Sequence, residues 1–452
     1  MILLISGLIL YLLKSLDLLY LFQIKEYRLD RILSFLKEEN VFKILYLRAI
    51  RMPAISLRNL LIGQAMLFST VPLYLILKTS NLALLSAFLL LTPIVALLTM
   101  LLGLLLSEIP VQIYRKLIIF IAALKVKNSN AVFIGITGSY GKTSTKEFLF
   151  QILSHKYKVG KTEKNYNSEI GVALSILKNL KSDTEYFIAE LGAYKKGEIK
   201  TICGIIHPKY GILTAIGNQH LNLFGSKKNL IEAKSELLEV LPPDGVAFIN
   251  KNIREWKYFS NKTKAEKEYF SIDEIPPDIK TNLPGRHNLQ NLLPCIALAS
   301  HLGLDRSVIL ETIMNLKPIQ DRLTQKKGPN ESMVLDDSYS SNVEGFIAAI
   351  NAAGQINSTH KLIISRGLIE LGEEKKTSYQ KIVDEINKSN LTLLTTDALF
   401  KKLDTRNKVV AFQNEGKLLN YVKEKSDKNT LIVIEGRFEP KILKSLISNF
   451  DV

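Results

Sequence analysis

Residues 131–153 read AVFIGITGSYGKTSTKEFLFQIL, and this stretch decides the fold of the central part of the chain. The run 131–136 predicts a short buried strand, and the pattern from Lys146 to Leu153 predicts an amphipathic helix. Between them lies Gly-x-x-Gly-Lys-Thr, a shorter form of the P-loop pattern. Glycines let backbone N–H groups approach phosphate oxygens, and a helix N-terminus adds partial positive charge. The stretch therefore predicts a phosphate-binding loop.

Two side chains of this loop are suited to nucleotide binding. Lys142 would neutralise the β- and γ-phosphates of ATP, and the Thr143 hydroxyl would ligate Mg²⁺. The usual P-loop spacing has glycine at position 136, where this chain has isoleucine. A chance glycine turn before a helix is the alternative, but the strand and helix on either side favour a nucleotide site.

Further strands follow downstream. Tyr186–Glu190 ends in a carboxylate, and Tyr210–Ile216 is followed by Gly-Asn-Gln and His220. Ligands of doubly wound sheets gather at the carboxyl ends of strands, so Glu190 and His220 are expected at the metal–phosphate site. Taken alone, each residue would more often be a surface or capping residue.

The C-terminal part alternates strand and helix patterns, which is typical of a Rossmann-like sheet with crossover helices. The predicted strands are 361–365, 391–395, 409–412 and 431–435, and the predicted helices are 378–388, 415–425 and 440–448. The fold class is therefore α/β, with a central P-loop domain and a C-terminal Rossmann-like domain.

Three apolar runs occupy the first quarter of the chain, at Ile2–Phe22, Leu60–Leu77 and Leu82–Leu106. Their lengths predict about three transmembrane helices. The first run is interrupted by Lys14 and Asp17 and could instead be an amphipathic helix that lies on a membrane. A cleaved signal peptide is less consistent with it, because a basic leader and a small-residue cleavage pattern are absent.

Basic residues predict the orientation of these helices. Residues 24–59 contain eight lysines and arginines, whereas the turn near 79–81 is flanked only by Lys78. The positive-inside rule then predicts an inner (cytoplasmic) membrane protein with its catalytic domains facing the cytoplasm. The segment 26–58 either contacts anionic membrane lipid or packs as a helical hairpin on the soluble part.

Composition excludes several classes of protein. The 452 residues include only two cysteines, which is too few for a disulfide framework or a four-cysteine zinc site. The net charge is +16, but aromatic residues are not interleaved with the basic ones as nucleic-acid binding requires. Anionic lipid or phosphate-bearing substrates explain the charge more simply than nucleic acid does.

With these motifs in order, the chain from about Val132 to its end resembles the Mur ligase family, the ATP-dependent amino-acid and peptide ligases of cell-wall precursor synthesis. The likeness is greatest to the branch that adds D-alanyl-D-alanine. The resemblance implies an acceptor loop at 165–171 and a nucleotide site of Gly138, Ser139, Tyr140, Gly141, Lys142, Thr143, Ser144, Asn250, Asn288, Asn291, Arg322 and Asp337.

The resemblance also implies the metal ligands and the catalytic residues. Thr143, Glu190, His220 and a carbamate on Lys234 would hold Mg²⁺, two ions in all, and Lys142, Lys234, Arg322 and His220 would be catalytic. Phosphoryl transfer from ATP would activate a carboxylate as an acyl phosphate, which an amine then attacks. Arg322 and Asp337 lie on a different domain from Lys142, so domain closure is expected.

Several residues keep a simpler interpretation beside this one. Lys234 could be an unmodified surface lysine, and Asp336 and Asp337 could end a strand and cap a helix. His287 reads as a structural histidine.

The sequence departs from the family pattern in three places. No counterpart of the uridine-nucleotide domain precedes the central domain, which makes a lipid-linked or membrane-proximal acceptor plausible. The stretches Ser365–Gly372 and Glu435–Phe438 depart from the family pattern where the amine substrate is read, so D-alanyl-D-alanine is not assigned from them.

The sequence therefore predicts a membrane-anchored, ATP-dependent carboxylate–amine ligase with domains 1–125, 126–315 and 316–452. It would add an amino acid or a dipeptide to a peptidoglycan or envelope precursor. The alternatives are a ligase for another polymer such as capsular polyglutamate, a P-loop transport ATPase and an inactive scaffold. A relative that carries a zinc ribbon is excluded by the cysteine count.

Overall fold

The computed structural model describes residues 2–25, 27–38, 41–47, 50–217, 221–283, 285–317, 319, 323–338, 342–368, 371, 374–436 and 438–447. The chain divides into two compact units, Met1–Phe120 and Ile121–Val452. The predicted three-domain division with boundaries at 125 and 315 stays a prediction.

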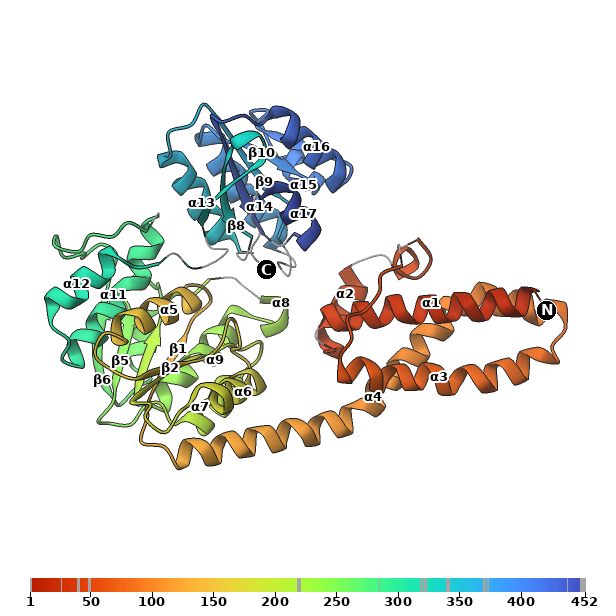
Figure 1. Ribbon diagram of the computed structural model, residues 1–452, viewed down its shortest axis with the longest axis horizontal. Coiled ribbons are helices and arrows are strands. Elements are labelled where there is room, and N and C mark those ends of the chain that lie inside the picture. The colour runs from red at the N-terminus through yellow and green to blue at the C-terminus, as the bar shows by residue number, and fades with distance from the viewer. Residues whose placement is uncertain are drawn as a thin grey trace. The chain divides into compact units, whose positions relative to one another are not determined.

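The described part of the first unit contains helices and connecting segments but no strand. It contains α1 (Ile2–Ile24), α2 (Leu29–Glu38), the π-helical turn η1 (Lys43–Leu47), α3 (Leu57–Lys78) and the start of α4 (Leu82–Lys127). Helices α1 and α3 pack side by side (Figure 1). Their core includes Tyr11, Leu18, Phe22, Ile62 and Met100.

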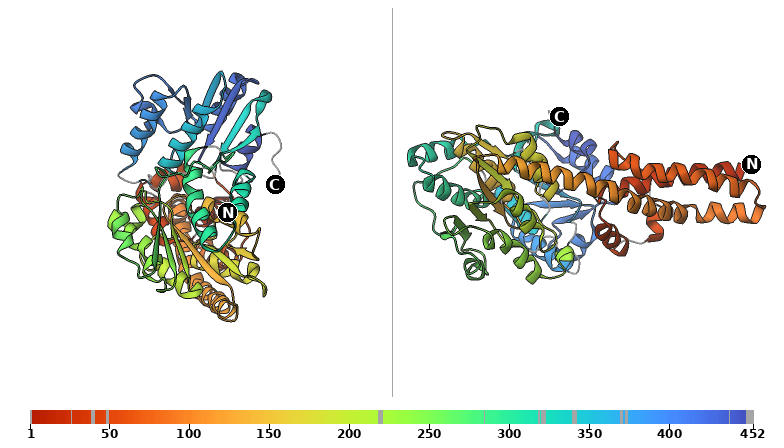
Figure 2. Two further views of the ribbon diagram at one scale, coloured as in Figure 1. Left: turned by 90° about the vertical axis from the view of Figure 1, so that its left-hand side faces the viewer. Right: turned by 90° about the horizontal axis from the view of Figure 1, so that it is seen from below.

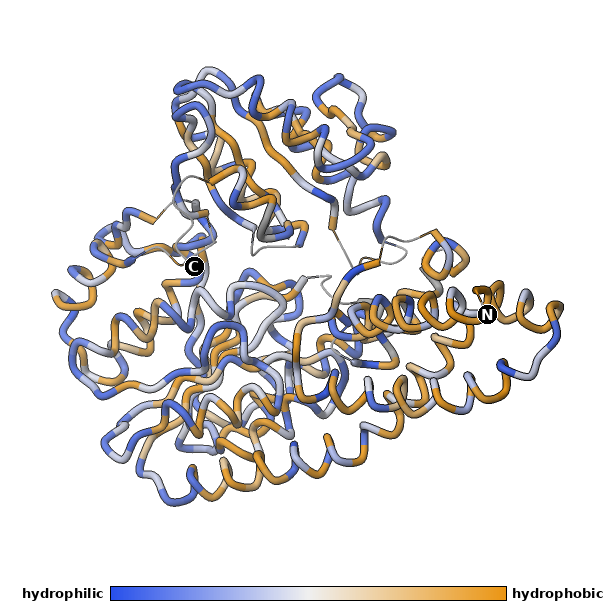
Figure 3. Tube along the Cα trace, turned by 45° about the vertical axis from the view of Figure 1, so that its right-hand side comes forward, coloured by the Kyte–Doolittle hydropathy of each residue, from blue (hydrophilic) through white to orange (hydrophobic). Residues whose placement is uncertain are grey.

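Helices α1, α3 and α4 are long and apolar enough to cross a membrane, by length and composition alone. Figure 3 shows hydrophobic residues along much of their length. Helix α4 continues well past the predicted end at Leu106 and reaches Lys127, with Pro110 inside it. The charges that interrupt the first apolar run form a buried ion pair, with Lys14 Nζ 2.9 Å from Asp17 Oδ2.

The second unit contains two six-stranded sheets with helices on both faces (Figures 1 and 2). In the first sheet all strands are parallel. Their order is β2 (Val159–Lys161), β3 (Tyr186–Glu190), β1 (Val132–Thr137), β4 (Tyr210–Leu213), β5 (Val246–Asn250) and β6 (Glu266–Phe270).

Alternating side chains of these strands build two cores. Ile134 and Ile136 of β1 pack with α5 (Lys142–Leu153), α11 (Arg286–His301) and α12 (Arg306–Met314). On the opposite face, Gly135 lies against Leu237. The helices that complete this sheet are α6 (Glu169–Asn179), α7 (Glu198–Ile206), α8 (Leu221–Phe224), α9 (Lys227–Glu239) and α10 (Trp256–Ser260).

The second sheet is parallel except for β7, which runs antiparallel to β8. Its order is β11 (Val409–Ala411), β10 (Thr392–Thr395), β9 (His360–Ser365), β12 (Thr430–Glu435), β8 (Met333–Asp337) and β7 (Thr324–Lys327). Its helices are α13 (Val343–Gln355), α14 (Lys375–Lys388), α15 (Ala398–Leu403), α16 (Glu415–Lys425) and α17 (Pro440–Leu446), with a 3₁₀ turn at Pro329–Glu331.

The predicted α/β class with parallel sheets is confirmed, and two local predictions are corrected. The strand predicted at Tyr210–Ile216 ends at Leu213, because the next residues leave the sheet to border the glycine loop. The helix predicted from Lys146 begins at Lys142, because Gly141 adopts a left-handed conformation that caps it.

Phe400 tests the core of the second sheet. It is fully buried and stacks on Tyr379 with ring centroids 3.8 Å apart. Phe400→Ala should lower the free energy of unfolding by about 3–5 kcal/mol, through lost burial and the cavity left behind. Urea denaturation followed by circular dichroism measures this loss.

Lys402→Ala, in the same helix but exposed, is the control and should change stability by less than about 0.5 kcal/mol. Equal stability of the two variants would contradict this description of the core.

Candidate active site

The loop between β1 and α5 has no room for side chains at its two glycines. Gly138 (φ +149°) has Thr214 Oγ1 only 2.1 Å from the place where a Cβ would stand. Gly141 (φ +83°) has Asn291 Oδ1 2.3 Å from its equivalent position. Both glycines are therefore required by sterics, and Gly141 also by its left-handed backbone.

The loop is fastened from β4 and β5. The Thr214 hydroxyl donates to the Tyr140 carbonyl at 2.6 Å, and Ser139 N donates to the Ala215 carbonyl at 2.7 Å. Asn250 is buried behind them, and its Nδ2 donates to the Thr214 carbonyl at 2.5 Å. Asn250 thus supports the segment that holds the loop, and its predicted contact with the nucleotide stays a prediction.

Lys142 begins helix α5 and folds back over the loop. Its ammonium group donates to the carbonyls of Gly138 at 2.9 Å and Ser139 at 3.3 Å. Thr143 and Ser144 are buried in the first turn of the helix. The N-terminus of α5 and the Lys142 ammonium together favour an anion at this place.

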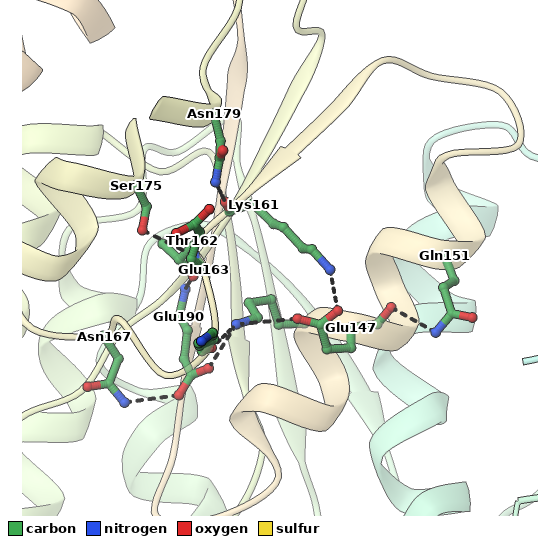
Figure 4. Close-up of polar contacts among 11 residues, drawn as sticks. Glu147, Gln151, Lys161, Thr162, Glu163, Asn167, Ser175, Asn179 and Glu190 are labelled. Carbon is green, nitrogen blue, oxygen red and sulfur yellow. Dashed lines mark hydrogen bonds and ion pairs between the residues drawn. The ribbon is translucent and has the colours of Figure 1, made fainter. Parts of the chain in front are cut away.

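Glu190 ends strand β3, and the residue is only 1% exposed. Oε1 accepts from Asn167 Nδ2 at 3.0 Å (Figure 4), and Oε2 lies 3.4 Å from Lys146 Nζ. Burial alone would raise the pKa of Glu190, but Lys146, Lys142 and the hydrogen bonds from Asn167 and Thr143 together lower it. Glu190 is therefore ionised at neutral pH.

The donor set at Glu190 fits Mg²⁺. Oε2 is buried and has no hydrogen-bond partner, and the Thr143 hydroxyl contacts the same carboxylate. Carboxylate and hydroxyl oxygens are the ligands that Mg²⁺ prefers. Within the described residues, no group of three His, Cys, Asp or Glu side chains is gathered for a metal, so Glu190 and Thr143 would share it with other ligands.

Lys234 of α9 lies in a small cavity with Gly138, Ser139, Lys142 and Asn167. The side chain is almost fully buried. Burial, reinforced by the Lys142 ammonium, lowers the pKa of Lys234 to about 7. A substantial part of Lys234 is therefore a neutral, nucleophilic amine at neutral pH.

A second cavity lies on the other side of the loop. Tyr140 and Gly141 of the loop, Asn291 of α11 and Glu344 of α13 line it. Burial, and to a lesser extent the Glu344 carboxylate, raise the pKa of Tyr140 to about 12. The predicted nucleotide residues that meet in this cavity are Tyr140, Gly141, Ser144, Asn288, Asn291 and Asp337.

Sequence reasoning missed three residues of this region: Lys146, Thr214 and Glu344. A signal was available for Lys146, because it follows Lys142 by four residues and thus lies on the same face of a helix. Thr214 and Glu344 carried no such signal.

Two predicted catalytic residues, His220 and Arg322, lie outside the described residues. So do Glu370, Gly372 and Arg437 of the divergent C-terminal stretches. Their predicted roles stay predictions.

The chain is similar in sequence to known ligases. Residues 136–276 match the model of the Mur ligase middle domain. The chain is 30% identical to the UDP-N-acetylmuramoyl-tripeptide–D-alanyl-D-alanine ligase of Synechocystis sp., over 58% of this chain and 62% of that enzyme. It is 27% identical to the Bacillus subtilis enzyme of the same name, over 70% of this chain and 76% of that enzyme.

Solved structures share the fold. MurF from Acinetobacter baumannii superposes with a TM-score of 0.65 at 24% identity, over 72% of this chain and 77% of that one. The MurF ligase from Thermotoga maritima in complex with ADP gives a TM-score of 0.63 at 21% identity, over 73% of this chain and 82% of that one.

These comparisons correct the predicted location. The sequence predicted an inner-membrane protein with cytoplasm-facing catalytic domains, but the ligases that it is similar to are soluble cytoplasmic enzymes. The prediction was drawn from apolar length and basic flanks, which do not establish membrane insertion. The membrane location is therefore wrong.

Gly141 tests the loop. Gly141→Ala should weaken ATP binding at least about tenfold, because the methyl group meets Asn291 and strains a left-handed backbone. Isothermal titration calorimetry with ATP measures the change. Gly197→Ala is the matched control, since Gly197 is also left-handed (φ +92°) and starts a helix but has open space around its Cβ position.

The control should lose only about 1–2 kcal/mol of stability and keep its ATP affinity. ATP binding by Gly141→Ala at the affinity of the unaltered protein would contradict the assignment of the loop.

Proposed function

We propose, from the premise that this chain belongs to the Mur ligase family, that it is an ATP-dependent, ADP-forming ligase that joins a carboxylate to an amine. One observation carries the proposal. Lys142, Lys234 and Asn167 meet in one cavity at the glycine loop, beside the ionised carboxylate of Glu190. That arrangement suits transfer of a phosphoryl group to a second anion.

The first step transfers the γ-phosphoryl group of ATP to a carboxylate oxygen of the acceptor. The bond from the γ-phosphorus to the β,γ-bridging oxygen breaks, a bond to the carboxylate oxygen forms, and ADP leaves. Lys142 would release the two loop carbonyls that it now binds and turn to the phosphates. Its charge, with the backbone N–H groups of the loop, would stabilise the transferring group.

Lys234 has the chemistry that a carbamate requires. Its neutral amine can attack CO₂, with loss of a proton, to give an N-carboxylate, which is anionic. This modification would replace a buried cation by an oxygen ligand near Lys142. Bound Mg²⁺, held by Thr143, Glu190 and this carbamate, would neutralise charge on the phosphates.

The second step is attack of an amine on the acyl phosphate. The amine nitrogen bonds to the acyl carbon, inorganic phosphate leaves, and the amine loses a proton. Asp337 and Glu344 come from the part of the chain that carries the second sheet, and they line the nucleotide cavity together with Tyr140. A cavity built from both parts suits a reaction that must exclude water.

The names of the relatives suggest the substrates. They are UDP-N-acetylmuramoyl-tripeptide–D-alanyl-D-alanine ligases, so we take a UDP-linked muramoyl tripeptide as acceptor and D-alanyl-D-alanine as amine. The chain covers less than two thirds of the Synechocystis and Escherichia coli enzymes, 62% and 60%. The described part of Met1–Phe120 contains helices and no strand. The assay below therefore also tests whether the protein recognises the uridine group.

The ligation assay tests this function. Purified full-length protein with ATP, Mg²⁺, UDP-N-acetylmuramoyl tripeptide and D-alanyl-D-alanine should release ADP and form the pentapeptide, which mass spectrometry identifies. A second arm uses the same muramoyl peptide without the uridine nucleotide. ADP release that is independent of acceptor and amine would instead indicate an ATPase, and a product with another amine would reassign the substrate.

Lys234 tests the carbamate. Lys234→Ala should lower kcat for ligation by about 10²–10³-fold, the usual cost of one group that stabilises a transition state. Added acetate or formate should restore part of the activity by filling the cavity with a carboxylate. Lys228→Ala, on the exposed side of the same helix, is the control and should keep full activity.

The modification has its own pH dependence. The pKa of Lys234 is about 7, so the neutral and protonated amines are about equal at pH 7. Their ratio rises about tenfold for each unit by which the pH increases. With ¹³C-bicarbonate, a carbamate NMR signal should grow from pH 6 to pH 8. An equal signal in Lys234→Ala, or its absence from the unaltered protein, would remove the carbamate from the mechanism.

A further inference from the structure

Lys146 is a fully buried lysine that the mechanism above does not use. It follows Lys142 by one helical turn on α5. Its ammonium group lies 3.4 Å from Glu190 Oε2 and 3.5 Å from Glu147 Oε1. It also donates a hydrogen bond to the carbonyl oxygen of Lys164, in the loop that follows β2.

Complete burial of an ammonium group is costly, so its partners must offset a large desolvation penalty. Two of the partners are carboxylates, and the third is a backbone carbonyl. Because two of these partners lie outside α5, the buried lysine fixes its own helix relative to two other segments. The partners lie on β3, on α5 itself and in the loop at 162–168.

The backbone at Lys164 is strained. Its φ is +42°, in the left-handed region that residues with a Cβ rarely occupy. Such a conformation costs about 1–3 kcal/mol and persists only where the surroundings impose it. The Lys164 carbonyl is the group that Lys146 binds, so the buried ammonium is well placed to impose it.

The same loop reaches Glu190 a second time through Asn167. Asn167 Nδ2 donates to Glu190 Oε1 at 3.0 Å, and the Asn167 carbonyl accepts from Gly192 N at 2.7 Å. Asn167 lines the cavity that also holds Lys142 and Lys234. The position of this loop thus decides one wall of the cavity.

We infer that Lys146 is a positioning residue that holds the loop 162–168 against Glu190 and thereby presents Asn167 to the acceptor carboxylate. The acceptor in this statement rests on the proposed function. The attachment of the loop to Lys146 and Glu190 does not, since it is a property of the protein before any substrate binds.

Lys161 offers a matched control. It is also a lysine beside this loop, and it pairs with Glu147, the neighbour of Lys146 (Figure 4). It lies over the ring of Phe150 and is partly exposed. Within the described part of the chain, its ammonium group forms no hydrogen bond or ion pair with Glu190 or Lys164. Loss of Lys161 removes a charge from the same network and leaves the attachment of the loop intact.

The experiment compares Lys146→Met and Lys161→Met in the full chain. Methionine keeps the length of the side chain and removes the ammonium. In metal-free protein, Lys146→Met should speed amide hydrogen exchange at Glu163 and Tyr166 about tenfold, the change expected for one lost charge-assisted hydrogen bond. Lys161→Met should leave exchange of these amides within about twofold of the unaltered protein.

Steady-state kinetics provides the second measurement. Lys146→Met should raise the KM for the acceptor about tenfold while the KM for ATP changes less than about twofold, because the inference assigns Asn167 to the acceptor and the proposed function assigns Lys142 to ATP. Lys161→Met should change neither value. If Lys146→Met fails to fold by circular dichroism, Lys146→Gln, which also loses the charge and the reach, is measured instead.

The outcomes separate this inference from the proposed function. Unchanged exchange of the loop in the Lys146 variant overturns the inference, and so does an equal rise of the two KM values. An unaltered protein that ligates nothing overturns the proposed function, while the exchange measurement still decides the role of Lys146.

Discussion

The buried carboxylate of Glu190 is the group around which the second unit is organised. Three lysines surround it. Lys142 and Lys146 lower its pKa, Lys146 also forms an ion pair with it, and Lys234 lies with Lys142 in the neighbouring cavity. Burying so much positive charge is costly unless anions accompany it. Lys146 offsets this desolvation cost by an ion pair with Glu190. Lys234 reduces it because its lowered pKa leaves part of the amine uncharged. These charges support the proposal that the site binds a phosphate and a second carboxylate.

The fold delivers these groups to one place through parallel strand order. Strands β3, β1 and β4 are neighbours in the sheet, so Glu190, the glycine loop and Thr214 emerge side by side at their carboxyl ends. The glycine loop is narrow because Thr214 and Asn291 stand where side chains would otherwise be. The phosphate site is therefore shaped by packing from neighbouring segments as much as by the loop sequence itself.

Much of this could be predicted from sequence. The glycine loop and the strand that ends at Glu190 are each determined by a short contiguous stretch of sequence, so they can be predicted without knowledge of distant contacts. For Lys146 the sequence signals only a position on the same helix face as Lys142. Its burial and its partners could not be predicted, because a lysine in an amphipathic helix is ordinarily exposed and two of the partners come from distant segments. Asn250 was assigned to the nucleotide site by resemblance, and its hydrogen bond to Thr214, a support of the glycine loop, was not foreseen. The membrane location failed because apolar length alone does not establish insertion.

The most direct test of the account follows an oxygen atom. If the γ-phosphoryl group passes to the acceptor carboxylate, then ligation of an acceptor labelled with ¹⁸O in that carboxylate must move one label into the inorganic phosphate released. We expect one ¹⁸O in each phosphate, read by mass spectrometry. Phosphate that carries no label from the acceptor would mean that water, and not the carboxylate, receives the phosphoryl group, which would contradict the account.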